Sequence, residues 1–282
     1  MDGFTGLLFF ARRYLGILLS ALPWLVLGII LEAAVLPRRR GRLSSKLSRD
    51  GVGLALFSGG AQALLLPDSL YEKAPSGGPS AWYRIILSRS LHPLLLISVF
   101  VVFRRQIVLP FYYLFFVIAG GLIVGLVVRL LVSAGMRDRD AGSAAPPPKE
   151  EEFTGRLVQR SYDHSVDLLF GAFLAAALHS LLGTTGLESM VFPPVILAFA
   201  TGALASPPPA AAGAVALSLF PLGQPSMTLA YLLGTGWGSL RVTGSLRRRL
   251  GWGLAIDVSL LIALLSILLS SLVTWTTLEL LS

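Results

Sequence analysis

Residues 195–222 read VILAFATGALASPPPAAAGAVALSLFPL, an apolar stretch interrupted near its middle by Pro207, Pro208 and Pro209. The stretch is long enough to cross a lipid bilayer, for which about 20 apolar residues suffice. A proline lacks the backbone N–H and disfavours the helical conformation of the residue before it, so successive prolines break a helix. The stretch therefore predicts a helix that breaks at membrane depth.

The composition of the whole chain also favours a membrane protein. Of the 282 residues, 54% are hydrophobic and only 13% are charged, whereas a soluble domain carries about 25% charged residues. The mean hydropathy is +0.75. The chain has no cysteine, which excludes disulfides and thiolate metal sites. We expect an all-α polytopic membrane protein in a lipid bilayer, with no metal and no cofactor.

Apolar segments of spanning length recur along the chain. The uninterrupted ones are 14–36, 107–133, 165–182 and 250–273. Two others, 81–103 and 227–240, are interrupted, the first by Arg84, Arg89 and His92-Pro93 and the second by glycines. Ahead of the first span, residues 1–13 place an apolar run before Arg12 and Arg13. A secretory signal has the reverse order, so we expect no cleaved peptide.

The positive charges predict which loops lie in the cytoplasm. The formal net charge of +8 is divided among short runs beside apolar segments. That pattern is typical of cytoplasmic loops of a multi-pass plasma-membrane protein and not of a nucleic-acid surface. We expect the run that starts at Arg38, the run 247–249 and the linker 136–160 on the cytoplasmic side. Segment 14–36 then runs inward and segment 165–182 runs outward.

The two halves of the chain share an order of breaks. Residues 1–135 and 161–282 are separated by a polar linker, rich in proline and charge, at 136–160. The number of positions from Pro79 to Ser90 equals the number from Pro225 to Gly236. The break at 58–60 likewise corresponds to the break at 206–208. With the directions above, the sequence predicts two inverted-topology repeats, with about six full spans and two re-entrant hairpins, at 51–87 and 195–222. Inverted repeats with broken helices are typical of secondary transporters.

The helix breaks are the candidate substrate pathway. Backbone N–H and C=O groups freed by a break can bind a polar solute or an ion where the bilayer offers no water. The candidate residues are Ser58, Gly59, Gly60, Gln62, Ser88, Ser90 and His92 in the first half, and Ser206, Pro207, Gly234, Thr235 and Gly236 in the second. Small residues at these positions also suit close helix packing, and His92 also suits a helix cap before Pro93, so both interpretations stay open.

Four ionisable residues within or near spans are further candidates. They are Glu32, Asp167, His179 and Asp257. Each also lies near the end of a span, where a side chain can reach the interface. Arg84 and Arg89 are too few for an electropositive pathway unless the hairpin brings them together.

At the breaks, the chain resembles the predicted-permease family of the DUF318 type, which includes the organoarsenical efflux permeases. Residues 88–93, SRSLHP, are similar to the Ser-Pro-x-x-Asn-Pro-like stretch of that family, with Arg89 for its proline and His92 for its asparagine. Residues 231–236, YLLGTG, are similar to its Phe-Leu-x-Gly-Pro segment. Many members carry Cys-x-Cys-Gly where residues 57–60 here read FSGG. The resemblance therefore implies a two-half permease fold without the sulfur ligands that capture soft metals or arsenic.

The sequence predicts a permease for a small solute or ion. It contains no glycine-rich phosphate loop and no HExxH or GxSxG motif, so we expect no enzymatic activity. The alternative is a non-transporting subunit or scaffold on a permease-derived fold, with other membrane subunits as partners. The missing cysteines and the substituted prolines at the breaks favour that alternative. No nucleic-acid partner is expected.

Overall fold

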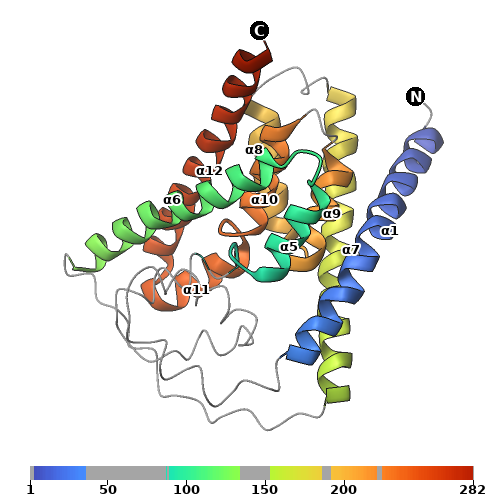
Figure 1. The fold of residues 1–282 in the computed structure, drawn as a ribbon, viewed down its shortest axis with the longest axis horizontal. Helices are drawn as coiled ribbons and strands as arrows, with labels where there is room; N and C mark the ends of the chain where they lie inside the picture. The colour runs from blue at the N-terminus through green and yellow to red at the C-terminus, as the bar shows by residue number, and fades with distance from the viewer. Residues whose placement is uncertain are drawn as a thin grey trace.

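The computed structural model describes residues 3–35, 87, 89–133, 153–185, 192–220 and 224–281. Regular structure within these ranges is helical, with no strand. The helices are α1 (Gly3–Val35), α5 (Pro93–Val102), α6 (Val108–Ser133), α7 (Phe153–Thr185), α8 (Phe192–Ala205), α9 (Pro209–Leu219), α10 (Pro225–Thr235), α11 (Leu240–Leu250) and α12 (Trp252–Leu281). Figure 1 shows α1 and α7 side by side at one edge, α6 and α12 at the other, and the short helices α5, α8, α9 and α10 between them.

Long apolar helices favour a membrane protein. In the described ranges, four helices are long and apolar enough to cross a bilayer, namely Thr5–Leu31, Val108–Val128, Leu157–Leu182 and Trp252–Val273. Only 28% to 44% of the residues in their most apolar windows are buried. On α12 the exposed Ile256, Leu260, Leu264 and Leu268 form a continuous apolar stripe. Such stripes are rare on soluble proteins and suit a lipid environment.

The stretch 195–222 breaks where the prolines predict. Helix α8 ends at Ala205, and α9 begins at Pro209, a residue favoured in the first turn of a helix. The break lies beside Gly171, near the middle of α7. From there α9 runs back along α1, with Ala210 next to Gly28 and the Ser218 hydroxyl 2.7 Å from the Ser20 hydroxyl. Helices α8 and α9 therefore form a hairpin whose turn lies in the interior of the bundle, as expected for the second re-entrant segment.

The directions of α1 and α7 agree with the inverted-repeat hypothesis. In Figure 1, α1 runs down from the N-terminus, and its neighbour α7 runs upward. Opposite directions of corresponding helices are what inverted repeats require. The repeat and the number of six spans stay predictions, because most of the first hairpin, 51–86, lies outside the described residues.

Two predicted boundaries are wrong. Helix α1 begins at Gly3, so Arg12 and Arg13 lie inside the helix and not ahead of it. Arginine is a good helix former, and apolar residues precede and follow the pair, so nothing ends the helix there. Helix α7 begins at Phe153, within the predicted linker 136–160 and ahead of the predicted span 165–182. Residues 153–164 are polar but contain no proline, and the helix, about 50 Å long, exceeds the roughly 30 Å of hydrocarbon.

Candidate functional site

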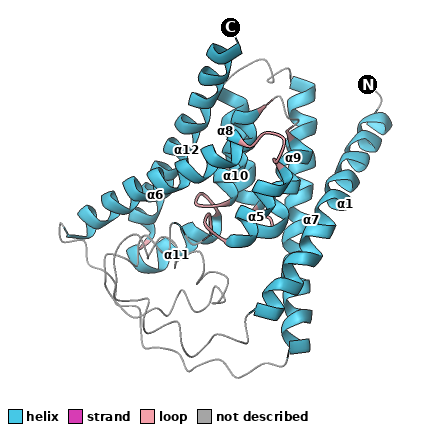
Figure 2. Ribbon diagram, viewed as in Figure 1, coloured by secondary structure: helices cyan, strands magenta, loops and turns pink. Residues whose placement is uncertain are grey.

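One arginine side chain joins the two halves of the chain at their breaks. The Arg89 Nε donates to the Thr235 carbonyl at 2.8 Å, and its Nη2 donates to the carbonyls of Ser206 at 2.9 Å and Pro207 at 3.0 Å. We call residues 89–92, 206–208 and 235–236 the break junction. Figure 2 shows pink turns beside α5 and α10, in the interior of the bundle.

The break junction is electrostatically suited to a cation. Helices α8 and α10 both end here, at Ala205 and Thr235. The C-terminal end of a helix carries about half a negative charge, and its last carbonyls lack intrahelical partners. The guanidinium of Arg89 binds the Thr235 carbonyl at the end of α10 and the Ser206 and Pro207 carbonyls just beyond the end of α8, so it places a positive charge at both helix ends. The carbonyls that the sequence predicted as free are therefore bound by a cation that belongs to the chain.

The backbone is strained at Ser206, whose carbonyl accepts from Arg89. Ser206 has a φ of 37°, in the left-handed region that a residue with a Cβ rarely adopts. Its hydroxyl donates to the Ala203 carbonyl at 2.9 Å, and its N–H donates to the Gly202 carbonyl at 3.0 Å. Strained residues of this kind persist where the surrounding structure determines them, and they gather at functional sites.

Ser90 and Gly236 meet on the other side of the break junction. The Tyr113 hydroxyl, from α6, donates to the Ser90 carbonyl at 3.1 Å. A Cβ on Gly236 would lie 2.5 Å from the Ser90 Oγ and 3.0 Å from the Tyr113 hydroxyl, so only glycine fits. The Ser90 side chain is fully buried, and its hydroxyl has no partner in hydrogen-bond geometry in the described part of the chain. A buried hydroxyl without a partner is unfavourable and calls for an explanation.

The contacts at the break junction join positions that the predicted repeat would make equivalent. The common spacing from Pro79 and from Pro225 pairs Ser90 with Gly236, and therefore pairs Arg89 with Thr235. In the structure each of these residues contacts the one with which the spacing pairs it. Equivalent residues of inverted repeats meet where the pseudo-two-fold axis passes between the repeats.

His92 acts as a helix cap. The Leu94 N–H donates to the His92 Nδ1 at 3.3 Å, and Pro93 occupies the first turn of α5. The imidazole is buried at this helix start. The capping interpretation of His92 is confirmed, and the predicted break before α5 lies at this residue.

The other predicted pathway residues lie in close helix packing or outside the described residues. A Cβ on Gly234 would clash with the backbone of Phe199 and Ala203, and one on Gly202 would clash with the backbone of Tyr231. These glycines allow the backbones of α8 and α10 to touch. Ser58, Gly59, Gly60, Gln62 and Ser88 lie outside the described residues.

The ionisable candidates do not gather at the break junction. Asp167, on α7, forms an ion pair with Arg241 at the start of α11. The His179 Nδ1 lies 3.5 Å from the Arg13 Nη2, and Asp257 is exposed near the start of α12. Arg84 and the side chain of Glu32 lie outside the description. Among the residues that the structure describes, no three His, Cys, Asp or Glu side chains lie together as metal ligands would.

Sequence reasoning missed Tyr113 and judged Arg89 insufficient for a pathway. Arg89 had a signal, since an arginine beside a break in an apolar segment is a functional candidate by position. Tyr113 had none, because its contact with Ser90 depends on how α6 packs.

Comparison of the chain with protein-family models, with curated proteins and with solved structures found no match.

Proposed function

We propose that the chain is a permease-like protein of the plasma membrane that moves a small polar solute or ion through the break junction. The observation that carries the proposal is the contact of Arg89 with Thr235 and of Ser90 with Gly236. Broken helices from two inverted halves that meet at membrane depth are the substrate sites of secondary transporters. The proposal agrees with the resemblance to the DUF318-type permeases, although the chain lacks the sulfur ligands of many members.

Polar groups at the break junction support a solute site. The Ser90 hydroxyl is buried without a hydrogen-bond partner in the described residues, although it lies near the Tyr113 hydroxyl. Arg89 supplies a fixed positive charge beside it. A solute that entered between the halves would find a hydroxyl and a guanidinium there. The Arg89 guanidinium lies beside the broken helix ends, where many transporters bind a coupling cation.

We place the linker and the basic runs on the cytoplasmic side. Figure 1 shows the end of α1, the start of α7 and the basic helix α11 toward one end of the molecule, and both termini toward the other. Arg247 lies 4.0 Å from the ring centre of Trp252, so α11 is fixed against the start of α12. Basic residues beside span ends favour the cytoplasmic side, while tryptophan suits either interface.

Solute flux in proteoliposomes tests the proposal, with Ser90→Ala as the decisive variant. This change removes a hydroxyl that has no partner in hydrogen-bond geometry in the described residues, although the Tyr113 hydroxyl lies beside it, and leaves the Tyr113 bond to the backbone intact. In a panel of radiolabelled small cations, anions and amino acids, we expect wild-type flux of at least one solute above that of empty liposomes. Ser90→Ala should slow this flux about tenfold with an unchanged thermal midpoint, the effect of one lost hydrogen bond to a bound solute. Unchanged flux in the variant would exclude the break junction as the pathway.

The second candidate function is a scaffold that does not transport. The close backbone packing at Gly202 and Gly234 and the Arg89 hydrogen bonds favour it, since both oppose movement of the halves. Purification from native membranes in mild detergent separates the two functions. A stoichiometric membrane partner together with no flux of any solute in the panel would favour the scaffold.

A further inference from the structure

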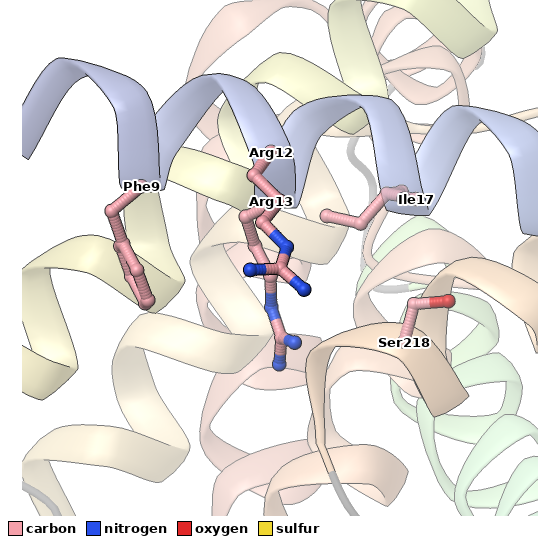
Figure 3. A pocket seen from close by; sticks show the side chains of 6 residues that line it. Phe9, Arg12, Arg13, Ile17 and Ser218 are labelled. Atoms are coloured by element: carbon pink, nitrogen blue, oxygen red, sulfur yellow. The ribbon is translucent and has the colours of Figure 1, made fainter.

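A cavity of about 510 Å³ lies between α1 and the last turn of α9 and shares no residue with the break junction. Its lining is Phe9, Arg12, Arg13, Gly16, Ile17 and Ser218. Figure 3 shows the Arg12 and Arg13 side chains leaving α1 on the same side, toward the helix that carries Ser218. Two guanidinium groups therefore share one cavity in a helix long and apolar enough to span a membrane.

The charge of these arginines is not neutralised by the residues that line the cavity. The Arg13 Nη2 lies 3.5 Å from the His179 Nδ1, a weak contact, and the Arg13 Nε is buried with no hydrogen-bond partner among the described residues. No carboxylate is among the described lining residues. The end of α9, at Ser218, contributes about half a negative charge against two positive ones. Arg12 is exposed and Arg13 is partly buried, and the buried Arg13 Nε still lacks an acceptor among the described residues. Cations in a membrane-spanning helix are costly without an anion, so an anion from outside the chain is expected here.

The position of the cavity along α1 suits an interfacial ligand. Arg13 lies about 27 Å from Leu31 along the helix axis, at the usual rise per residue. This distance is close to the thickness of the hydrocarbon core, about 30 Å. If Leu31 lies near one interface of the bilayer, the arginines lie near the other, within reach of phosphate groups in water or in lipid headgroups.

We propose that this cavity binds one phosphate group, held by Arg12 and Arg13, at the interface opposite the linker. A guanidinium matches the geometry of phosphate through paired N–H donors, and phosphate accepts from several donors at once. Gly16 leaves the space open, since a Cβ at this residue would meet no atom within 4 Å. The phosphate comes either from free phosphate in solution or from a phospholipid headgroup. The inference does not rest on transport through the break junction.

The first arm of the test measures free phosphate. The purified full chain in nanodiscs of phosphatidylcholine is titrated with radiolabelled orthophosphate. If the occupant is free phosphate, binding is saturable, and Arg12→Gln with Arg13→Gln weakens it about tenfold or more. Gly16→Leu, which keeps both arginines and fills the cavity, has the same effect. The matched controls are Arg104→Gln, an exposed arginine elsewhere, and Gly6→Leu, an exposed glycine of α1 with open space around it.

The second arm measures retained lipid. Native mass spectrometry of the chain extracted in mild detergent counts bound phosphatidylglycerol. If a headgroup is the occupant, the wild type and the two control variants retain one more lipid than the cavity variants. Weaker phosphate binding or loss of one lipid in the cavity variants supports the proposal, and the arm in which it occurs identifies the source of the phosphate. If variants with native thermal midpoints match their controls in both arms, the proposal is wrong.

Discussion

Arg89 is the residue on which the break junction depends most. Its side chain donates to the Thr235 carbonyl at the end of α10 and to the Ser206 and Pro207 carbonyls in the break after α8. A mobile cation could neutralise the same helix ends but would leave when conditions changed. An arginine keeps its charge at any pH in the physiological range, so the junction stays neutralised without a bound ion.

Arg89→Ala should destabilise the protein, because it leaves three buried carbonyls without donors. We expect a loss of about 3 kcal/mol in the free energy of unfolding. Arg89→Lys should restore part of it, since one ammonium keeps the charge but lacks the planar fork. Thermal unfolding in detergent, followed by tryptophan fluorescence, measures both. Arg104→Ala, at an exposed position, serves as the control and should change stability by less than about 0.5 kcal/mol.

Gly236→Ala tests the contact with Ser90. The new Cβ would lie 2.5 Å from the Ser90 Oγ, and overpacking of this kind costs about 1–3 kcal/mol. Ser90→Ala in the same chain should recover part of the loss, because it removes the atom in the way. A double-mutant cycle with no coupling between the two positions would contradict the contact.

At the scale of elements, the proline-broken hairpin and the packing of α8 on α10 position the junction. The backbones of α8 and α10 touch at glycines, and Arg89 binds carbonyls at or just beyond the ends of both helices. Only a residue without a side chain permits that approach, and the chain places Gly202 on one helix and Gly234 on the other.

Gly202→Ala should therefore be costly. Its Cβ would meet the backbone of Tyr231 and Thr235, which cannot rotate away, and we expect a loss of about 3 kcal/mol. The control is Gly244→Ala in α11, where a Cβ meets no atom within 4 Å and should stabilise the helix by up to about 1 kcal/mol. Equal thermal midpoints for the two variants would argue against close packing of α8 on α10.

The helix breaks were predicted from the sequence more accurately than the helix starts. Prolines break a helix through local sterics, so the breaks at 206–208 and before α5 were predicted at the correct residues. The start of α1 was wrong because apolar residues continue the helix ahead of Arg12 and Arg13, and the start of α7 was wrong because polar residues without proline can extend a helix into water. The contact of Arg89 with the second half depends on tertiary packing, and no local pattern encodes it.

At the scale of the whole molecule, the topology makes a prediction about sides of the membrane. The chain has no native cysteine, so single cysteines report without background. Gly155→Cys, at the start of α7, should react with a membrane-impermeant maleimide only after the cells are permeabilised. Gly6→Cys and Arg105→Cys should react in intact cells. All three positions are exposed. Labelling of all three from the same side would contradict the proposed arrangement.

The most direct test of the central claim, that the break junction is a solute pathway, is the reactivity of Ser90→Cys. This residue is fully buried in the described conformation, so a reagent reaches it only when the halves separate. The measurement is the rate of modification in native membranes by a small impermeant methanethiosulfonate reagent added to each side. Ser266→Cys, equally buried on α12, is the control. A permease predicts that Ser90→Cys reacts from at least one side while Ser266→Cys does not. If Ser90→Cys were as unreactive as the control from both sides, the break junction would be a dry, static seam, and the claim would be contradicted.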